Sequence, residues 1–162
     1  MAGMTDFLEN KLVDWFFRAQ AIGITGATAA AGTGPATLYV GLFTAAPSDT
    51  GGGTEVSGNA YARVAITSSM TASGWAGTQG AGTTVASSGT GATTSNNGAS
   101  NFPTPTPSGW GGGSPVTHFG IFDASSGGNL LWWGALGASK VINVGDTVSI
   151  AAGQLQITVD NN

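Results

Sequence analysis

The chain has no cysteine and one histidine, His118. It can therefore form no disulfide, no thiolate nucleophile and no cysteine-ligated metal site. A zinc site at His118 would need two or three further nitrogen or sulfur ligands, and the sequence contains none. His118 lies in the alternating stretch Val-Thr-His-Phe, so we interpret it as a structural histidine within a sheet rather than a general base. We expect no cofactor and no metal.

Charge is also scarce, because only 7% of the residues are charged, against about a quarter in typical domains. Dispersed monomers usually carry a charged surface. A neutral surface of small residues suits static contact with other proteins, since little has to be desolvated. A stable secreted β domain with a Thr/Ser/Gly coat is the alternative. The formal net charge is −4, and the cations are scattered along the chain at Lys11, Arg18, Arg63 and Lys140. We therefore expect no nucleic-acid partner.

Long hydrophobic runs are missing as well. No apolar stretch approaches the roughly 20 residues needed to span a bilayer, so no membrane partner is expected. The opening segment carries acids rather than the basic region of a secretory signal, which predicts a protein without Sec-type export.

Acidic residues occur mostly in or beside glycine-rich turns, at Asp49, Glu55, Asp123, Asp146 and Asp160. Turn capping is the simplest interpretation of these positions. A glycosidase pair would need two carboxylates facing each other across a cleft, and calcium would need several oxygens converging at one point. Neither is excluded by the sequence. Gly-rich segments such as 51–53 lack the Gly-Lys-Ser/Thr ending of a phosphate loop.

The first twenty residues predict an amphipathic helix. Thr5-Asp6 followed by Glu9 indicates an N-cap with a capping-box partner, and Asp14 with Arg18 makes an i,i+4 ion pair. The apolar stripe consists of Leu8, Leu12, Trp15, Phe16 and Ala19. A helix this apolar must pack on its own sheet or on a neighbouring subunit.

From residue 36 onward β signals dominate. Residues 38–43 predict a strand buried on both faces, and 61–67 a second strand. Residues 116–123 and 129–136 predict a hairpin around the turn 125–128. Two further strands, 141–144 and 147–150, flank Gly145-Asp146, and 154–160 closes the chain. Six to eight short strands predict an all-β sandwich or barrel.

The middle of the chain, 68–115, is rich in Gly, Ser and Thr. We expect short strands there, such as one at 83–85, with Trp75, Phe102 and Trp110 as anchors; disorder is the alternative. The proline-rich segment 102–107 cannot be a central strand. The predicted organisation is a helix and linker arm, 1–35, followed by a β domain, 36–162.

Adjacent tryptophans Trp132 and Trp133 face opposite sides of a strand, so one is expected in the core and the other on the outer face. The outer ring would contact a partner protein or, alternatively, stack on a sugar. Exposed rings on a small-residue surface are typical interface anchors. The predicted interface residues are Trp15, Phe16, Trp110, Trp132 and Trp133.

Three stretches resemble a family of small virion proteins of tailed phages: FLENKLVDWFFRAQ (7–20), LYVGLFTAAPSDTGGGTEVSGNAYARVAI (38–66) and HFGIFDASSGGNLLWWGAL (118–136). Members of this family are labelled as tail-fibre-like, and the family looks like the capsid cement proteins that sit between capsomers. The resemblance implies a jelly-roll-like antiparallel β-sandwich with an N-terminal helix. It implies no catalytic residues.

The resulting expectation is a non-enzymatic capsid decoration protein, made in the host cytoplasm and placed on the phage head surface. Its partners would be the major capsid protein and itself, as a homodimer or homotrimer. It would stabilise the head by burying surface across subunit boundaries. A tail-associated or short tail-fibre subunit with a structural or receptor-binding role is the alternative.

Overall fold

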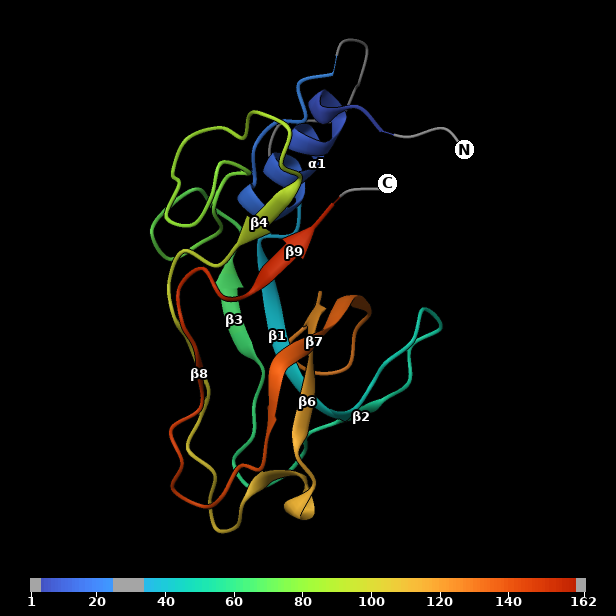
Figure 1. The fold of residues 1–162 in the computed structure, drawn as a ribbon, viewed down its shortest axis with the longest axis vertical. Coiled ribbons are helices and arrows are strands. Elements are labelled where there is room, and N and C mark those ends of the chain that lie inside the picture. Colours follow the sequence, from blue (N-terminus) through green and yellow to red (C-terminus); the bar gives the residue numbers. More distant parts are fainter. Residues whose placement is uncertain (1–3, 25–33, 160–162) are drawn as a thin grey trace. The chain divides into compact units, whose positions relative to one another are not determined.

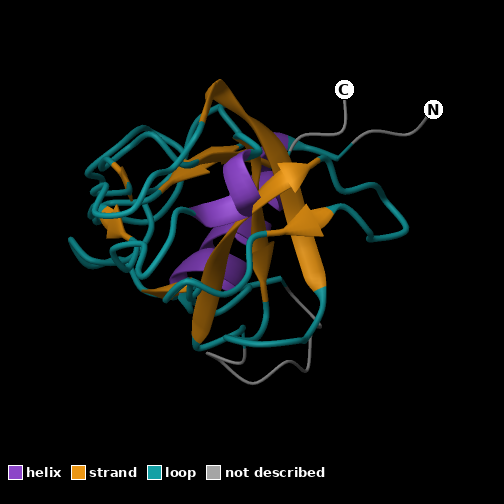
Figure 2. Cartoon of the chain, turned by 90° about the horizontal axis from the view of Figure 1, so that it is seen from below, coloured by secondary structure: helices purple, strands orange, loops and turns teal. Residues whose placement is uncertain are grey.

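The computed structural model describes residues 4–24 and 34–159. Most regular structure is antiparallel β, with one α-helix and long loops (Figure 2). This confirms the expected all-β fold with an N-terminal helix, whereas the jelly-roll detail stays a prediction. The chain divides into two compact units: unit 1 comprises 1–37, 66–99 and 150–162, and unit 2 comprises 38–65 and 100–149. These bounds differ from the predicted arm and β domain, a division that stays a prediction.

The main sheet belongs largely to unit 2 and has the order β2-β1-β6-β7, with β3 also pairing with β1 (Figure 1). The strands are β1 (Thr37–Ala45), β2 (Thr54–Glu55), β3 (Val64–Thr67), β6 (Val116–Phe122) and β7 (Leu130–Lys140). The strand predicted at 38–43 and the hairpin around 125–128 are both confirmed. On one face, Val40, Leu42 and Ile121 are at most 3% exposed, so the alternating apolar residues form a core there.

A second cluster in unit 2 holds the proline-rich segment in place. The rings of Tyr61, Phe102 and Trp110 lie 5.3 to 6.5 Å apart. The indole Nε1 of Trp110 donates to the carbonyl of Asn59 at 3.0 Å. Trp110 opens the 3₁₀ turn η1 (Trp110–Gly113), and the short strand β5 (Ser100–Asn101) pairs with β8 (Ser149–Ile150). Residues 102–107 lie outside any strand, as predicted.

Unit 1 is built around α1 (Asp6–Arg18) and the strand pair β4 (Thr93–Ser95) with β9 (Gln156–Thr158). Phe17 is buried against Trp75, with ring centroids 4.9 Å apart. Asn96, fully buried, holds the loops together by donating to the carbonyl of Ala151 and accepting from the amide of Leu155. The side chain of Asn96 therefore joins, by hydrogen bonds, loops of unit 1 that no β-ladder connects at this point.

The helix begins where predicted, but its buried side differs from the prediction. Thr5 is the N-cap, although its side chain makes no capping hydrogen bond. The buried helix residues are Glu9, Val13, Asp14, Phe17 and Arg18, whereas Trp15 and Phe16 of the predicted stripe are only half-buried. The Asp14–Arg18 ion pair is confirmed, and it is buried. The described helix is too short to cross a membrane.

One strand prediction is wrong, and two others hold only in part. Residues 83–85 form no strand, because Thr83 closes a turn onto Gly80 and the carbonyl of Val85 accepts from Arg18. The second strand begins at Val64 rather than at 61, since positive φ angles at Asn59 and Ala60 turn the chain there.

The third concerns the pair of strands around Gly145. Residues 141–144 form no strand, and of 147–150 only Ser149–Ile150 is a strand, β8, which pairs with β5. The backbone of residues 142–145 bonds to the segment 105–110 instead, through Trp110 N–H to the carbonyl of Ile142 and Gly145 N–H to the carbonyl of Pro105. The tight turn itself is present, closed by Asp146 N–H to Asn143. Residues 25–33 of the predicted linker, and Asp160, lie outside the described residues.

Candidate functional site

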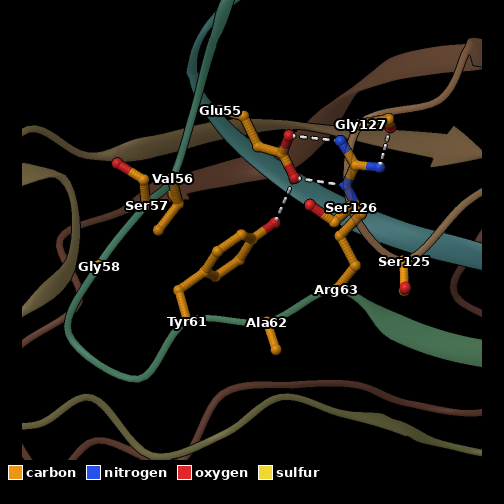
Figure 3. A pocket seen from close by; sticks show the side chains of 10 residues that line it. All are labelled: Glu55, Val56, Ser57, Gly58, Tyr61, Ala62, Arg63, Ser125, Ser126 and Gly127. Atoms are coloured by element: carbon orange, nitrogen blue, oxygen red, sulfur yellow. Dashed lines mark hydrogen bonds and ion pairs between the residues drawn. The ribbon is translucent and has the colours of Figure 1, made fainter.

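Glu55, Tyr61 and Arg63 form a polar cluster in unit 2 (Figure 3). Glu55 ends β2, whereas Tyr61 and Arg63 lie on the segment that leads into β3. Glu55 pairs with Phe43 of β1, and its carboxylate lies over Gly41 of the same strand. Three segments that are separate in the sequence therefore meet at this cluster: the end of β2, the approach to β3 and the β6–β7 turn.

Arg63 is held by four hydrogen bonds. Its Nε and Nη2 donate to the two oxygens of Glu55 at 2.8 and 2.7 Å, a bidentate pair. Its Nη1 donates to the carbonyls of Ala124 and Gly127 at 2.8 and 2.7 Å. The guanidinium carbon also lies 3.3 Å from the centre of the Phe122 ring. Arg63 therefore fastens the β6–β7 turn to β2, and a lysine could not reproduce this planar geometry.

Tyr61 completes the cluster. Its hydroxyl donates to Glu55 Oε1 at 3.0 Å and accepts from the amide of Leu42 at 2.8 Å. Burial, together with the negative charge of Glu55, raises the pKa of the phenol well above its ordinary value. The hydroxyl consequently keeps its proton and acts as a fixed hydrogen-bonding group.

Two glycines make room for these side chains. Gly41 and Gly120 face each other across β1 and β6. A Cβ on Gly41 would lie 2.8 Å from Glu55 Oε1 and 2.9 Å from Cε2 of Phe122. A Cβ on Gly120 would lie 2.8 Å from Cε2 of Phe43. The stacked rings of Phe43 and Phe122 and the cluster above them thus require both positions to lack a side chain.

Beside the cluster lies an open pocket of about 340 Å³, lined by residues 55–58, 61–63 and 125–127. Ser57, Ser125 and Ser126 are exposed around it (Figure 3). Both carboxylate oxygens of Glu55 accept hydrogen bonds from Arg63, and the Tyr61 hydroxyl keeps its proton. The lining contains no histidine to activate a serine. This arrangement offers hydroxyl and backbone groups for static polar contacts rather than acid–base chemistry.

Three other titratable residues, His118, Asp123 and Asp146, have structural contacts. His118 lies within β6, with Nδ1 2.8 Å from Thr117 Oγ1, in line with its structural interpretation. Asp123 accepts from the amide and side chain of Asn129, both at 2.7 Å, and these bonds lower the pKa of its carboxyl. Asp146 accepts from the amide of Asn143. Turn capping is thus confirmed for Asp123 and Asp146. Among the described residues no group of three or more His, Cys, Asp or Glu could hold a metal.

The predicted interface residues do not gather at this pocket. Trp110 is fully buried within unit 2. Trp132 is half-buried and Trp133 is 40% exposed, so neither ring enters the core completely. Trp15 and Phe16 are half-buried on α1. An interface role for these five residues stays a prediction.

Sequence reasoning missed the cluster itself. It assigned Glu55 to a turn and used Arg63 only as one of the scattered cations. The available signal was the alternation of Tyr61 and Arg63 in a stretch otherwise composed of small and aliphatic residues, which places a cation and a phenol side by side. Glu55, the common partner of these two side chains, lies eight residues before Arg63 and could not be identified from sequence spacing alone.

Comparison with known proteins gives one family match. The family model described as Podophage GP4 fiber I protein gp80 matches residues 3–158, which includes every residue of the cluster and pocket. No curated protein matches the sequence.

Proposed function

The chain belongs to the podophage GP4 fiber I protein gp80 family, and from this membership we propose that it is a non-enzymatic structural subunit of a fibre on a tailed-phage particle. The observation that carries the proposal is the extent of the match, which runs from residue 3 to residue 158. The family is one of phage virion structural proteins, in agreement with the sequence resemblance.

The chemistry of the described residues supports a structural role. The carboxylate of Glu55 is neutralised by a bidentate arginine, and the carboxylates of Asp123 and Asp146 cap turns. These three carboxylates thus accept hydrogen bonds that hold segments of the chain together. Such a protein contributes shape and contact surface to an assembly rather than turnover.

The family description fits the tail-fibre alternative better than the head cement role preferred from sequence alone. Sparse charge and a small-residue surface are equally suited to either location, because both require close contact with neighbouring subunits. The major capsid protein stays a predicted partner only under the head alternative.

Quantitative mass spectrometry of purified virions, calibrated against the major capsid protein, tests the proposal. A fibre subunit should be present in dozens of copies or fewer, whereas a head decoration protein should reach hundreds, as order-of-magnitude expectations from closed symmetry. Immunogold labelling should mark the tail vertex. Uniform labelling of heads with hundreds of copies would contradict a fibre role and support the cement alternative.

A phage lacking the gene provides the matched control. Its particles should have full, stable heads and should lack one set of appendages. Heads that leak DNA or break on dilution, with all appendages present, would contradict the fibre role independently of the copy number.

A further inference from the structure

The pocket beside the Glu55 cluster has hydrogen-bonding groups that the fold does not use. The exposed residues Ser57, Ser125 and Ser126 line it, and their hydroxyls have no hydrogen-bond partner within the described part of the chain. Ser57 lies between β2 and β3, whereas Ser125 and Ser126 lie in the β6–β7 turn (Figure 3). Hydroxyls from two separate segments therefore reach one pocket, each able to donate and to accept a hydrogen bond.

The ion pair of Arg63 with Glu55 retains one more donor and one more acceptor. Arginine has five N–H donors, and four of those of Arg63 are used, two by Glu55 and two by carbonyls of the β6–β7 turn. An ionised carboxylate has about four acceptor sites, and Glu55 uses three of them, one for Tyr61 and two for Arg63. Among the residues that the structure describes, one Nη2 hydrogen and one lone pair of Oε2 are thus left without a partner. Both side chains line the pocket, at 8% exposure for Arg63 and 26% for Glu55.

The charges of the lining select a neutral, polar ligand. Arg63 and Glu55 neutralise each other, so the pocket offers no net charge to an anion or to a cation. An apolar ligand would remove water from three serine hydroxyls and from the ion pair without replacing the lost hydrogen bonds. A ligand rich in hydroxyl groups would replace them.

The unused donor and acceptor lie on neighbouring atoms. Nη2 of Arg63 donates to Oε2 of Glu55 at 2.7 Å, so both atoms can be reached by two adjacent groups of one ligand. Two neighbouring hydroxyls of a sugar ring match this arrangement, because one would donate to Oε2 while the other accepts from Nη2. Hydrogen bonds to ionised groups are stronger than those between neutral groups. The ion pair therefore suits a vicinal diol.

The size and the rim of the pocket fit one sugar ring of a longer chain. Its volume of about 340 Å³ lies at the lower end of the range of about 300–1,000 Å³ for small-ligand sites. A Cβ on Gly58 or on Gly127 would meet no atom within 4 Å, so the lining is open beside both residues. A bound ring could continue into further sugar units without meeting a side chain at these two positions.

We propose that this pocket binds a hexopyranose unit of a neutral glycan, with a vicinal diol on Arg63 and Glu55 and further hydroxyls on Ser57, Ser125 and Ser126. The proposal goes beyond the structural role in a fibre and rests on the groups of the pocket alone. It holds wherever in the particle the subunit lies, so its failure would leave the fibre assignment intact.

Nuclear magnetic resonance titration of the ¹⁵N-labelled full chain tests the proposal. The probes are the methyl pyranosides of glucose, galactose and mannose, since each carries a vicinal diol and its methyl group stands in for the rest of a glycan. A ligand of this size should bind with a dissociation constant of about 1 mM, so the titration runs to about 10 mM. At least one probe should give saturable shifts confined to residues 55–58, 61–63 and 125–127. Cyclohexanol, which has a ring without a diol, and N-methylacetamide, a model of a peptide, should give none.

Ser126→Leu should raise the dissociation constant at least tenfold, because the larger apolar side chain fills the pocket and removes a hydroxyl. The matched control is Ser139→Leu, the same change at an exposed position of β7, which should leave the constant unchanged. Ser57→Leu changes the other segment and gives an independent test if Ser126→Leu does not fold.

Three results would overturn the proposal. The first is the absence of saturable shifts with all three methyl pyranosides, or their appearance outside the pocket. The second is an equal response to cyclohexanol or N-methylacetamide, which would indicate a site for another kind of ligand. The third is unchanged affinity in a folded Ser126→Leu or Ser57→Leu variant. Free glucose that binds far more tightly than its methyl pyranoside would overturn the assignment to a glycan chain.

Discussion

Arg18 is the most heavily engaged buried cation of unit 1, and its removal should destabilise the protein strongly. Its side chain is fully buried, and that of its ion-pair partner Asp14 is 6% exposed. Arg18 also donates to the carbonyls of Trp75 and Val85, at 3.2 and 2.5 Å. Asp14 accepts in addition from the amide of Ser87 at 2.9 Å. The pair thus ties the end of α1 to the loop 75–87, which has little regular structure of its own.

Arg18→Met keeps much of the side-chain length and removes the charge. Asp14 would then be a buried carboxylate without its cation, and the two carbonyls would lose their donor. Breaking a buried ion pair from one side typically costs about 3–5 kcal/mol. Because small domains are stable by only about 5–15 kcal/mol, we expect a loss of roughly a third of the free energy of unfolding.

Urea denaturation followed by tryptophan fluorescence measures this loss. Lys11→Met is the matched control, because it removes a cation from the same helix whose contact with the Phe7 ring, 5.7 Å away, is weak. It should cost less than about 1 kcal/mol. The double variant Asp14→Leu with Arg18→Met should recover part of the loss, since apolar pairs often replace buried ion pairs without penalty. An Arg18→Met variant as stable as Lys11→Met would refute the reasoning.

Three further predictions concern unit 2. Gly41→Ala should cost about 1–3 kcal/mol and lower the melting temperature, because its Cβ has no space below Glu55; an unchanged melting temperature would contradict this packing. Tyr61→Phe should cost about 1–3 kcal/mol by leaving the Leu42 amide unpaired. It should also abolish a gradual loss of stability as pH rises above 10, because there the unfolded phenol gives up its proton while the folded phenol, with its raised pKa, keeps it. For Asp123 the pKa is lowered, so its contribution is lost as pH falls below the ordinary value of 3.8; Asp123→Asn should flatten the acid-unfolding curve there.

The candidate site was only partly predictable from the sequence. The turn-capping roles of Asp123 and Asp146 followed from their places beside glycines, because such capping is local. The partners of Arg63 are the carbonyls of Ala124 and Gly127, more than sixty residues away, together with a carboxylate that local pattern assigned to a turn. Contacts of this kind leave no periodicity in the chain.

The sequence by itself determined the elements whose signal is local. Alternating apolar residues at 38–43 gave a doubly buried strand, the turn at 125–128 gave the β6–β7 hairpin, and Thr5 marked the start of α1. Only the tertiary structure decided which side of α1 is buried. The helix is apolar around much of its circumference, and the choice of Val13 and Phe17 over Trp15 and Phe16 depended on Trp75 and on partners for Arg18. The local pattern of apolar residues specifies that this segment is a helix. Which face of the helix is buried depends on distant groups, such as the carbonyl of Trp75, that hydrogen-bond to the buried charge of Arg18.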